Sequence, residues 1–210
     1  MKPVLSTGLA AATLCLVASC VASSQTEAQS AAPADSAQTD SSNTAGSLTA
    51  PVRQRLDDLQ AAVDGWQRAG DLDAAKAAAE TARNLVTGPD VNGYGDLDGD
   101  GRTGGASTTG LLPGEQGQPG LITSPAPACV ERDVLGGSWA DPSGRWQEVR
   151  TRVAVWSQTN NTFPALPSHP QRVVGWASLT LAAPTLELAR EYAGHAQLHV
   201  RITREALNGC

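Results

Sequence analysis

The stretch Leu186–Leu207, with the sequence LELAREYAGHAQLHVRITREAL, is the part of the chain that most clearly decides the fold. Apolar or small residues recur in it at steps of three and four, which places them on one face of a helix. These residues are Leu186, Ala189, Ala193, Ala196, Val200, Thr203 and Leu207. Small residues let a helix approach its neighbour closely, so the stretch predicts a long helix in an antiparallel bundle or in a coiled coil with a partner.

Four earlier segments have the same helical spacing of apolar residues. The second of them follows Asp71, a good N-cap, and the fourth opens with Ser168 and Gln171, the pattern of a capping box. The segments cover residues 52–66, 72–87, 146–156 and 168–181. Together with the last helix, they predict a mainly α domain over residues 49–210, an antiparallel helical bundle of about four to five helices.

A long segment rich in Gly, Pro and Thr, residues 90–127, interrupts the helices and predicts a loop. Near its start the chain reads Asp96-Leu97-Asp98-Gly99-Asp100-Gly101. Three carboxylates alternate with other residues, and a glycine that permits a sharp turn stands at the sixth position. Ca²⁺ takes six to eight oxygen ligands, and this spacing lets a tight loop wrap its carboxylates around one ion.

Residues 96–107 resemble the calcium loop of EF-hand and dockerin domains. The resemblance implies that Asp96, Asp98 and Asp100 give side-chain oxygens to Ca²⁺ and that Arg102 gives its backbone carbonyl. The expected role of such a site is structural. Extracellular loops of this kind bind calcium with dissociation constants of roughly 10⁻⁴ to 10⁻³ M.

The loop departs from the EF-hand pattern at its twelfth position, where Ser107 replaces the bidentate glutamate. Glu115 or Asp90 would have to supply a carboxylate from outside the loop. The alternative interpretation is a solvated acidic turn without an ion, because Asp and Gly also dominate ordinary turns.

The N-terminus predicts export. Lys2 precedes an uncharged apolar segment that is too short to span a membrane comfortably and is typical of a secretory signal. It ends in Val17-Ala18-Ser19-Cys20, which resembles the lipobox of bacterial lipoproteins. The resemblance implies a signal peptide over residues 1–19, lipidation of Cys20 and attachment to the bacterial cell envelope; ordinary cleavage nearby is the alternative. Residues 20–48 are rich in Ser, Ala and Thr and predict a disordered tether.

Cysteine content agrees with an exported protein. Of the four cysteines, Cys15 lies in the predicted signal peptide and Cys20 is the predicted lipid site. Cys129 and Cys210 remain as an even pair outside the reducing cytosol, so we expect a disulfide between them.

Charge and motifs limit the functions. The formal net charge of −6 and the lack of a basic run argue against nucleic acid as a partner. The sequence contains no nucleophile elbow, phosphate loop or dinucleotide fingerprint, so we expect a non-catalytic envelope or binding module. Glu191, His195 and His199 fall on one face of the last helix, and two imidazoles there support an alternative, a transition-metal binder or metal-dependent enzyme.

Overall fold

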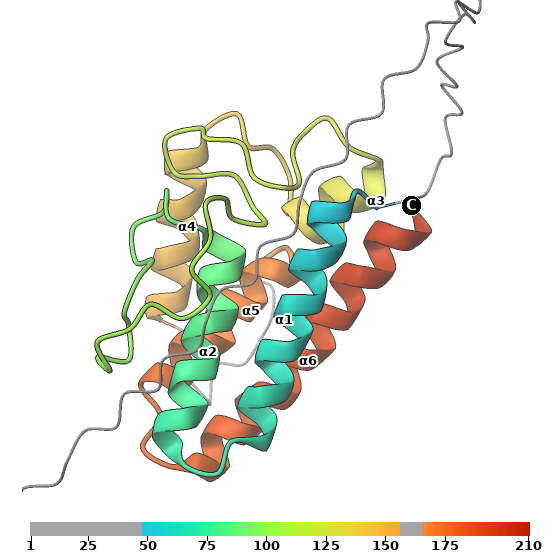
Figure 1. Cartoon of the computed structure of the whole chain (residues 1–210). Coiled ribbons are helices and arrows are strands. Elements are labelled where there is room, and N and C mark those ends of the chain that lie inside the picture. Colours follow the sequence, from blue (N-terminus) through green and yellow to red (C-terminus); the bar gives the residue numbers. More distant parts are fainter. Residues whose placement is uncertain (1–47, 156–165) are drawn as a thin grey trace, which may run out of the picture. The chain divides into compact units, whose positions relative to one another are not determined.

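A computed structural model describes residues 48–155 and 166–210, which belong to one compact unit, and its core is a four-helix bundle. The bundle helices are α1 (Ala50–Arg68), α2 (Leu72–Thr87), α5 (His169–Leu181) and α6 (Leu186–Gly209). Around the bundle, α1 packs on α2, α2 on α5, α5 on α6, and α6 on α1. Neighbouring helices run in opposite directions (Figure 1), so the predicted antiparallel helical bundle is confirmed.

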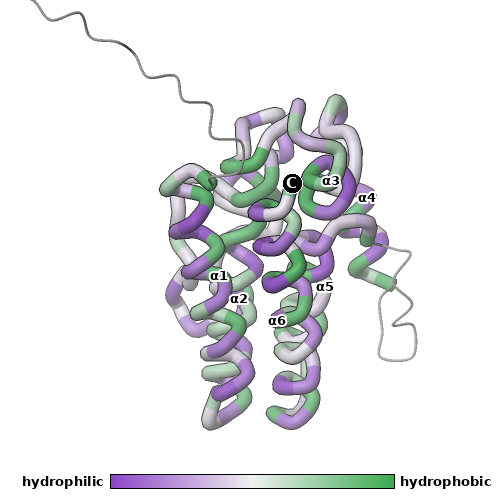
Figure 2. The backbone as a smooth tube through the Cα atoms, turned by 90° about the vertical axis from the view of Figure 1, so that its right-hand side faces the viewer, coloured by the Kyte–Doolittle hydropathy of each residue, from purple (hydrophilic) through white to green (hydrophobic). Residues whose placement is uncertain are grey.

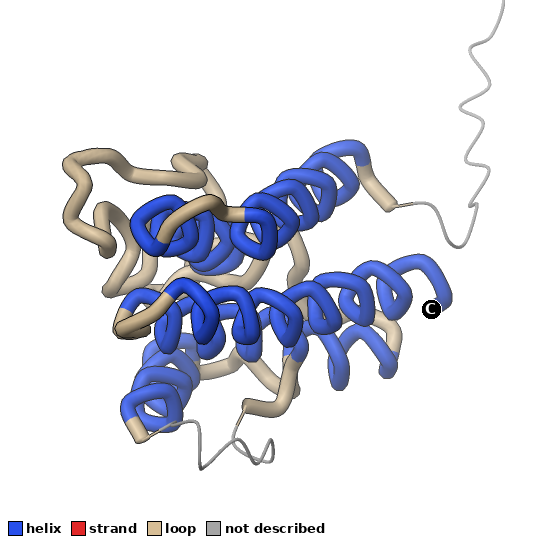
Figure 3. The backbone as a smooth tube through the Cα atoms, turned by 90° about the horizontal axis from the view of Figure 1, so that it is seen from below, coloured by secondary structure: helices blue, strands red, loops and turns tan. Residues whose placement is uncertain are grey.

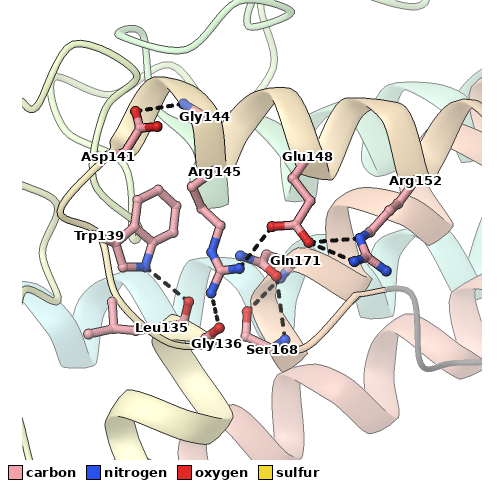
Figure 4. Close-up of polar contacts among 10 residues, drawn as sticks. All are labelled: Leu135, Gly136, Trp139, Asp141, Gly144, Arg145, Glu148, Arg152, Ser168 and Gln171. Carbon is pink, nitrogen blue, oxygen red and sulfur yellow. Dashed lines mark hydrogen bonds and ion pairs between the residues drawn. The ribbon is translucent and has the colours of Figure 1, made fainter.

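The predicted helix starts are confirmed at two N-caps. The Asp71 side chain accepts a hydrogen bond of 2.8 Å from the N–H of Ala74, and α2 begins at the next residue. At the start of α5, the Ser168 hydroxyl accepts the N–H of Gln171, and the Gln171 side chain accepts the N–H of Ser168 (Figure 4). Each cap satisfies backbone N–H groups that have no partner inside the helix.

The bundle core combines large aromatic residues with alanines. The predicted stripe of α6 is buried from Ala189 to Thr203, while its two terminal leucines are half-buried. Trp66 and Trp176 are each at most 1% exposed, and the Trp66 indole N–H donates to the Ala189 carbonyl over 2.8 Å. Hydrophobic and hydrophilic stretches recur along each helix of the bundle (Figure 2), as a helix with one buried face requires.

The helix α4 (Pro142–Ala154) lies outside the four-helix core and packs against α5. It is fixed by Trp146, whose indole N–H donates to the Pro113 carbonyl over 2.8 Å, and by Arg145, which donates to the carbonyl of Gly136 and to Glu148 (Figure 4). The sequence predicts this helix as far as Trp156. In the structure α4 ends at Ala154, and Trp156 lies outside the described residues.

Between the long loop and α4 the structure contains a short helical segment that the sequence analysis did not predict. It consists of α3 (Ala128–Val130) and a π-helical turn, η1 (Glu131–Leu135). Cys129 in α3 forms a disulfide with Cys210 at the end of α6, with 6.2 Å between the two Cα atoms. The predicted disulfide therefore ties this segment to the last residue of the chain.

Residues 88–127 form the predicted long loop, and no strand occurs in the described parts of the chain (Figure 3). The loop is anchored where the N–H groups of Leu111 and Leu112 donate to the carbonyls of Leu85 and Val86 at the end of α2. Gly88 has a φ of +70°, and a Cβ atom there would lie 2.2 Å from the backbone of Gly110. This close approach requires glycine.

None of the helices in the described residues is both long enough and apolar enough to cross a membrane.

Candidate metal centre

Glu80, on the face of α2 that meets the long loop, organises the acidic loop, residues 96–107. Its side chain is 2% exposed, although Glu is rarely buried without partners. One carboxylate oxygen accepts the N–H groups of Leu97 and Asp98, and the other accepts the N–H of Gly104 over 2.7 Å. Hydrogen bonds to a charged acceptor are roughly twice as strong as neutral ones, so Glu80 holds both ends of the acidic loop against the helix.

The acidic loop also closes on itself. The two carboxylate oxygens of Asp96 accept the N–H groups of Gly99 and Gly101 over 2.8 and 2.9 Å. Asp98 accepts the N–H of Asp100, and Asp100 accepts the N–H of Arg102. These bonds run between residues two to five apart, which is how Asp side chains stabilise tight turns.

The fold brings three carboxylates together. One oxygen each from Glu80, Asp96 and Asp98 lies within 4.8 Å of the others. Burial raises the pKa of the Asp98 carboxyl, and the nearby charges of Glu80, Asp100 and Asp96 raise it further, against the hydrogen bond from Asp100. Because like charges at this distance repel, the ionised cluster favours a cation at its centre.

Two glycines shape the loop, Gly101 at its turn and Gly104 where it approaches α2. Gly101 has a φ of +84°, a conformation that side chains rarely adopt, and it stands at the sixth position of the loop as predicted. A Cβ atom on Gly104 would lie 2.4 Å from the hydroxyl of Thr81 and 3.3 Å from a carboxylate oxygen of Glu80. A side chain at residue 104 would therefore push the loop away from Glu80.

The donor set fits a hard divalent cation. All three clustered groups are carboxylates, which suit Ca²⁺ and Mg²⁺, and the set contains no thiolate or imidazole that would select a softer metal. A cavity of about 400 Å³ adjoins the cluster between the first turns of α2 and the loop. Asp98 and Asp100 line this cavity together with Asp73 and Lys76 of α2.

The structure unites some of the predicted ligands and separates others. Asp96 and Asp98 are in the cluster, whereas Asp100 is outside it. That the backbone carbonyl of Arg102 is a ligand of the cation remains a prediction. Ser107, at the twelfth position, donates its hydroxyl to the Thr109 carbonyl over 3.3 Å.

Neither of the two outside carboxylates considered from the sequence belongs to the cluster; Glu80 does. Glu115 instead pairs with Arg150 over 2.6 Å and accepts the N–H of Asn92. The hydrogen bond from Arg150, followed by that from Asn92, lowers the pKa of the Glu115 carboxyl. Glu80 was missed because it lies 16 residues before the loop; a glutamate on the buried face of an Ala-rich helix was the available signal.

The three histidines divide between two contacts. His195 stacks on the Trp176 ring, with 4.3 Å between ring centroids. His199 instead meets His169, with 2.9 Å between their Nδ1 atoms, which links α6 to the start of α5. Burial, and then the neighbouring His169, lower the pKa of His199 to about 3, so its ring is neutral at pH 7.

The predicted grouping of Glu191, His195 and His199 does not form a cluster of three metal-capable side chains in the described part of the chain. The His169 contact joins residues 30 apart in sequence, so helical spacing could not reveal it.

Comparisons with protein-family models, curated proteins and solved structures give no match for this chain.

Proposed function

We propose that this protein is a lipid-anchored, exported, non-catalytic domain in which Ca²⁺ fastens the long loop to the helical bundle. The observation that carries the calcium part is the position of Glu80. A residue of α2 contributes to a carboxylate cluster with Asp96 and Asp98 and also accepts the N–H groups of the loop. A cation bound there would join the helix and the loop through one centre.

The proposed role of the ion is structural because the cluster lies at the base of a loop that reaches across the domain. The same loop supplies Leu111 and Leu112, which are fully buried, and Pro113, which binds the Trp146 indole of α4. Fixing its acidic end would support the packing of α4. The domain would then present a calcium-stabilised surface at the cell envelope to a protein or glycan partner.

Calcium is expected to raise the melting temperature of the domain. With a dissociation constant near 10⁻³ to 10⁻⁴ M, about 10 mM Ca²⁺ would stabilise the folded state by roughly 2 kcal/mol, or about 5 °C. Calorimetry in calcium and in chelator measures this shift. Asp96→Ala and Asp98→Ala should each abolish it, whereas Asp57→Ala, in α1 and outside the carboxylate cluster, should preserve it. Equal melting of the unmutated protein in both buffers would favour the acidic-turn interpretation.

Metal analysis separates the proposal from its rival. The transition-metal alternative requires zinc, iron or copper in stoichiometric amount and its loss when His195 and His199 are both replaced by Gln. The positions of these rings, one against Trp176 and the other against His169, favour a packing role.

The lipid anchor is supported by the lipobox-like sequence, and Cys20 itself lies outside the described residues. Cys20→Ala is expected to move the protein from the membrane fraction to the soluble fraction, or to block its processing. Mass spectrometry of the N-terminal peptide should detect the lipid on the unmutated protein, and Cys15→Ala, inside the signal, serves as the matched control. Unchanged processing and membrane partitioning of Cys20→Ala would exclude the anchor.

A further inference from the structure

A small cavity lies where α2, α4 and α5 meet, and it is separate from the carboxylate cluster. Its volume is about 160 Å³, and much of its wall is apolar: Trp146 and Val149 of α4 and Val174 of α5 line it. In another protein an engineered apolar cavity of about 150 Å³ holds a benzene molecule. This cavity therefore has room for one small ring or a short aliphatic group.

Two arginines line the same cavity, and each has a buried nitrogen that makes no hydrogen bond within the described residues. Arg83 of α2 donates through Nη1 to the Gly93 carbonyl, while its Nε is buried and has no hydrogen-bond partner among the described residues. Arg150 of α4 donates through Nη2 to Glu115, while its Nη1 is buried and has no partner in the described parts of the chain. A buried donor without an acceptor is costly, more so when it is charged.

The charges around the cavity are not balanced. Glu115 offsets Arg150, but within the described residues Arg83 forms no salt bridge, and no acidic side chain of those residues lines the cavity. Burial lowers the pKa of Arg83, against the nearby charge of Glu80, which raises it, and an arginine stays charged at pH 7. An anion in the cavity would meet a positive environment.

We propose that this cavity binds a compact monocarboxylate, with the carboxylate held by Arg83 and Arg150 and the apolar body against Trp146, Val149 and Val174. Guanidinium groups match carboxylates with paired hydrogen bonds. The apolar wall favours a carboxylate with a hydrocarbon body over inorganic phosphate, which would leave that wall without contacts. The site is independent of the calcium proposal.

Benzoate is a suitable probe because its ring matches the cavity and its carboxylate tests the arginines. For a ligand of this size we expect a dissociation constant of about 1 mM. Titration of the whole chain in calcium, followed by NMR, should give contacts from the ring protons to the methyl groups of Val149 and Val174. Benzyl alcohol, which has the same ring without the charge, should bind at least about tenfold more weakly, and inorganic phosphate should not compete with benzoate.

Two variants test the site from different sides. Arg83→Gln should weaken benzoate about tenfold and bring its affinity close to that of benzyl alcohol. Val153→Trp should block the cavity from its half-buried rim without changing either arginine, and Arg68→Gln, whose side chain is 72% exposed, should bind benzoate normally. Any one of three results would overturn the proposal. These are equal affinity for benzoate and benzyl alcohol, unchanged benzoate binding by a folded Val153→Trp variant, and no saturation at benzoate concentrations up to about ten times the expected dissociation constant.

Discussion

Glu80→Ala is expected to be among the most destabilising single substitutions in this domain when calcium is present. It removes the acceptor of three loop N–H groups and one of the three clustered carboxylates. Loss of hydrogen bonds to a buried charged group, together with loss of the ion's stabilisation, should lower the free energy of unfolding by about 4 kcal/mol. Chemical denaturation in calcium and in chelator measures the effect.

The contrast between the two buffers is the decisive part of this experiment. In chelator the same substitution should cost less, because it also relieves repulsion among Glu80, Asp96 and Asp98. Glu80→Gln keeps the shape and one acceptor oxygen, so it should retain part of the stability but lose most of the calcium response. Glu205→Ala, at a side chain that is 67% exposed, is the matched control and should change stability by less than about 0.5 kcal/mol. An identical loss for Glu80→Ala with and without calcium would mean that Glu80 only organises the loop.

Removing the disulfide is expected to have an effect of similar size. Cys129 and Cys210 are 81 residues apart, and chain-entropy arguments give about 4.5 kcal/mol for a crosslink over that length. The double variant Cys129→Ala/Cys210→Ala should therefore melt about 10 °C lower than the unmutated domain. We expect the loss to be greatest at α3 and the end of α6, where hydrogen exchange should accelerate first.

Reduction provides an independent control for the crosslink. A thiol reductant should lower the melting temperature of the unmutated domain and leave the double variant unchanged. Mass spectrometry of unreduced peptides should recover Cys129 linked to Cys210. If both thiols react with an alkylating agent in the native exported protein, the crosslink is absent and the expected loss disappears.

Both substitutions act at sites with no direct role in the small cavity. The residues that line that cavity include neither Glu80 nor either cysteine. Benzoate binding by folded Glu80→Ala protein would therefore show that the two proposed sites are independent. Loss of both functions together would point to a general collapse of the loop and α4.

The helices were predictable because their signals are local. The N-cap at Asp71 and the capping box at Ser168 depend on residues three positions apart, and the α6 stripe depends on steps of three and four. The long loop was predictable for the same reason, since a dense run of Gly and Pro disfavours a continuous helix. The short α3 and η1 turn escaped prediction because it contains too few residues for a period to emerge.

Two of the three residues in the carboxylate cluster were predictable from the sequence. Asp96 and Asp98 are neighbours in the sequence, so their spacing indicated a cation site without any knowledge of the fold. Glu80 joins them only because α2 and the returning loop lie against each other, with Gly104 allowing the approach. Spacing along the sequence does not distinguish Glu80 from Glu115 or Asp90 as the partner from outside the loop.

By itself, the sequence determined the helical class, the starts of α2 and α5, the loop, the pair of cysteines and the acidic turn, because each depends on residues close together or on composition. The tertiary structure decided which distant groups meet: Glu80 with the acidic loop, His169 with His199, and Arg83 with Arg150 around one cavity. The physical reason is that these contacts depend on how the bundle helices and the loop pack, and the pattern of buried apolar residues specifies a helix face but not the polar partner that will lie opposite it.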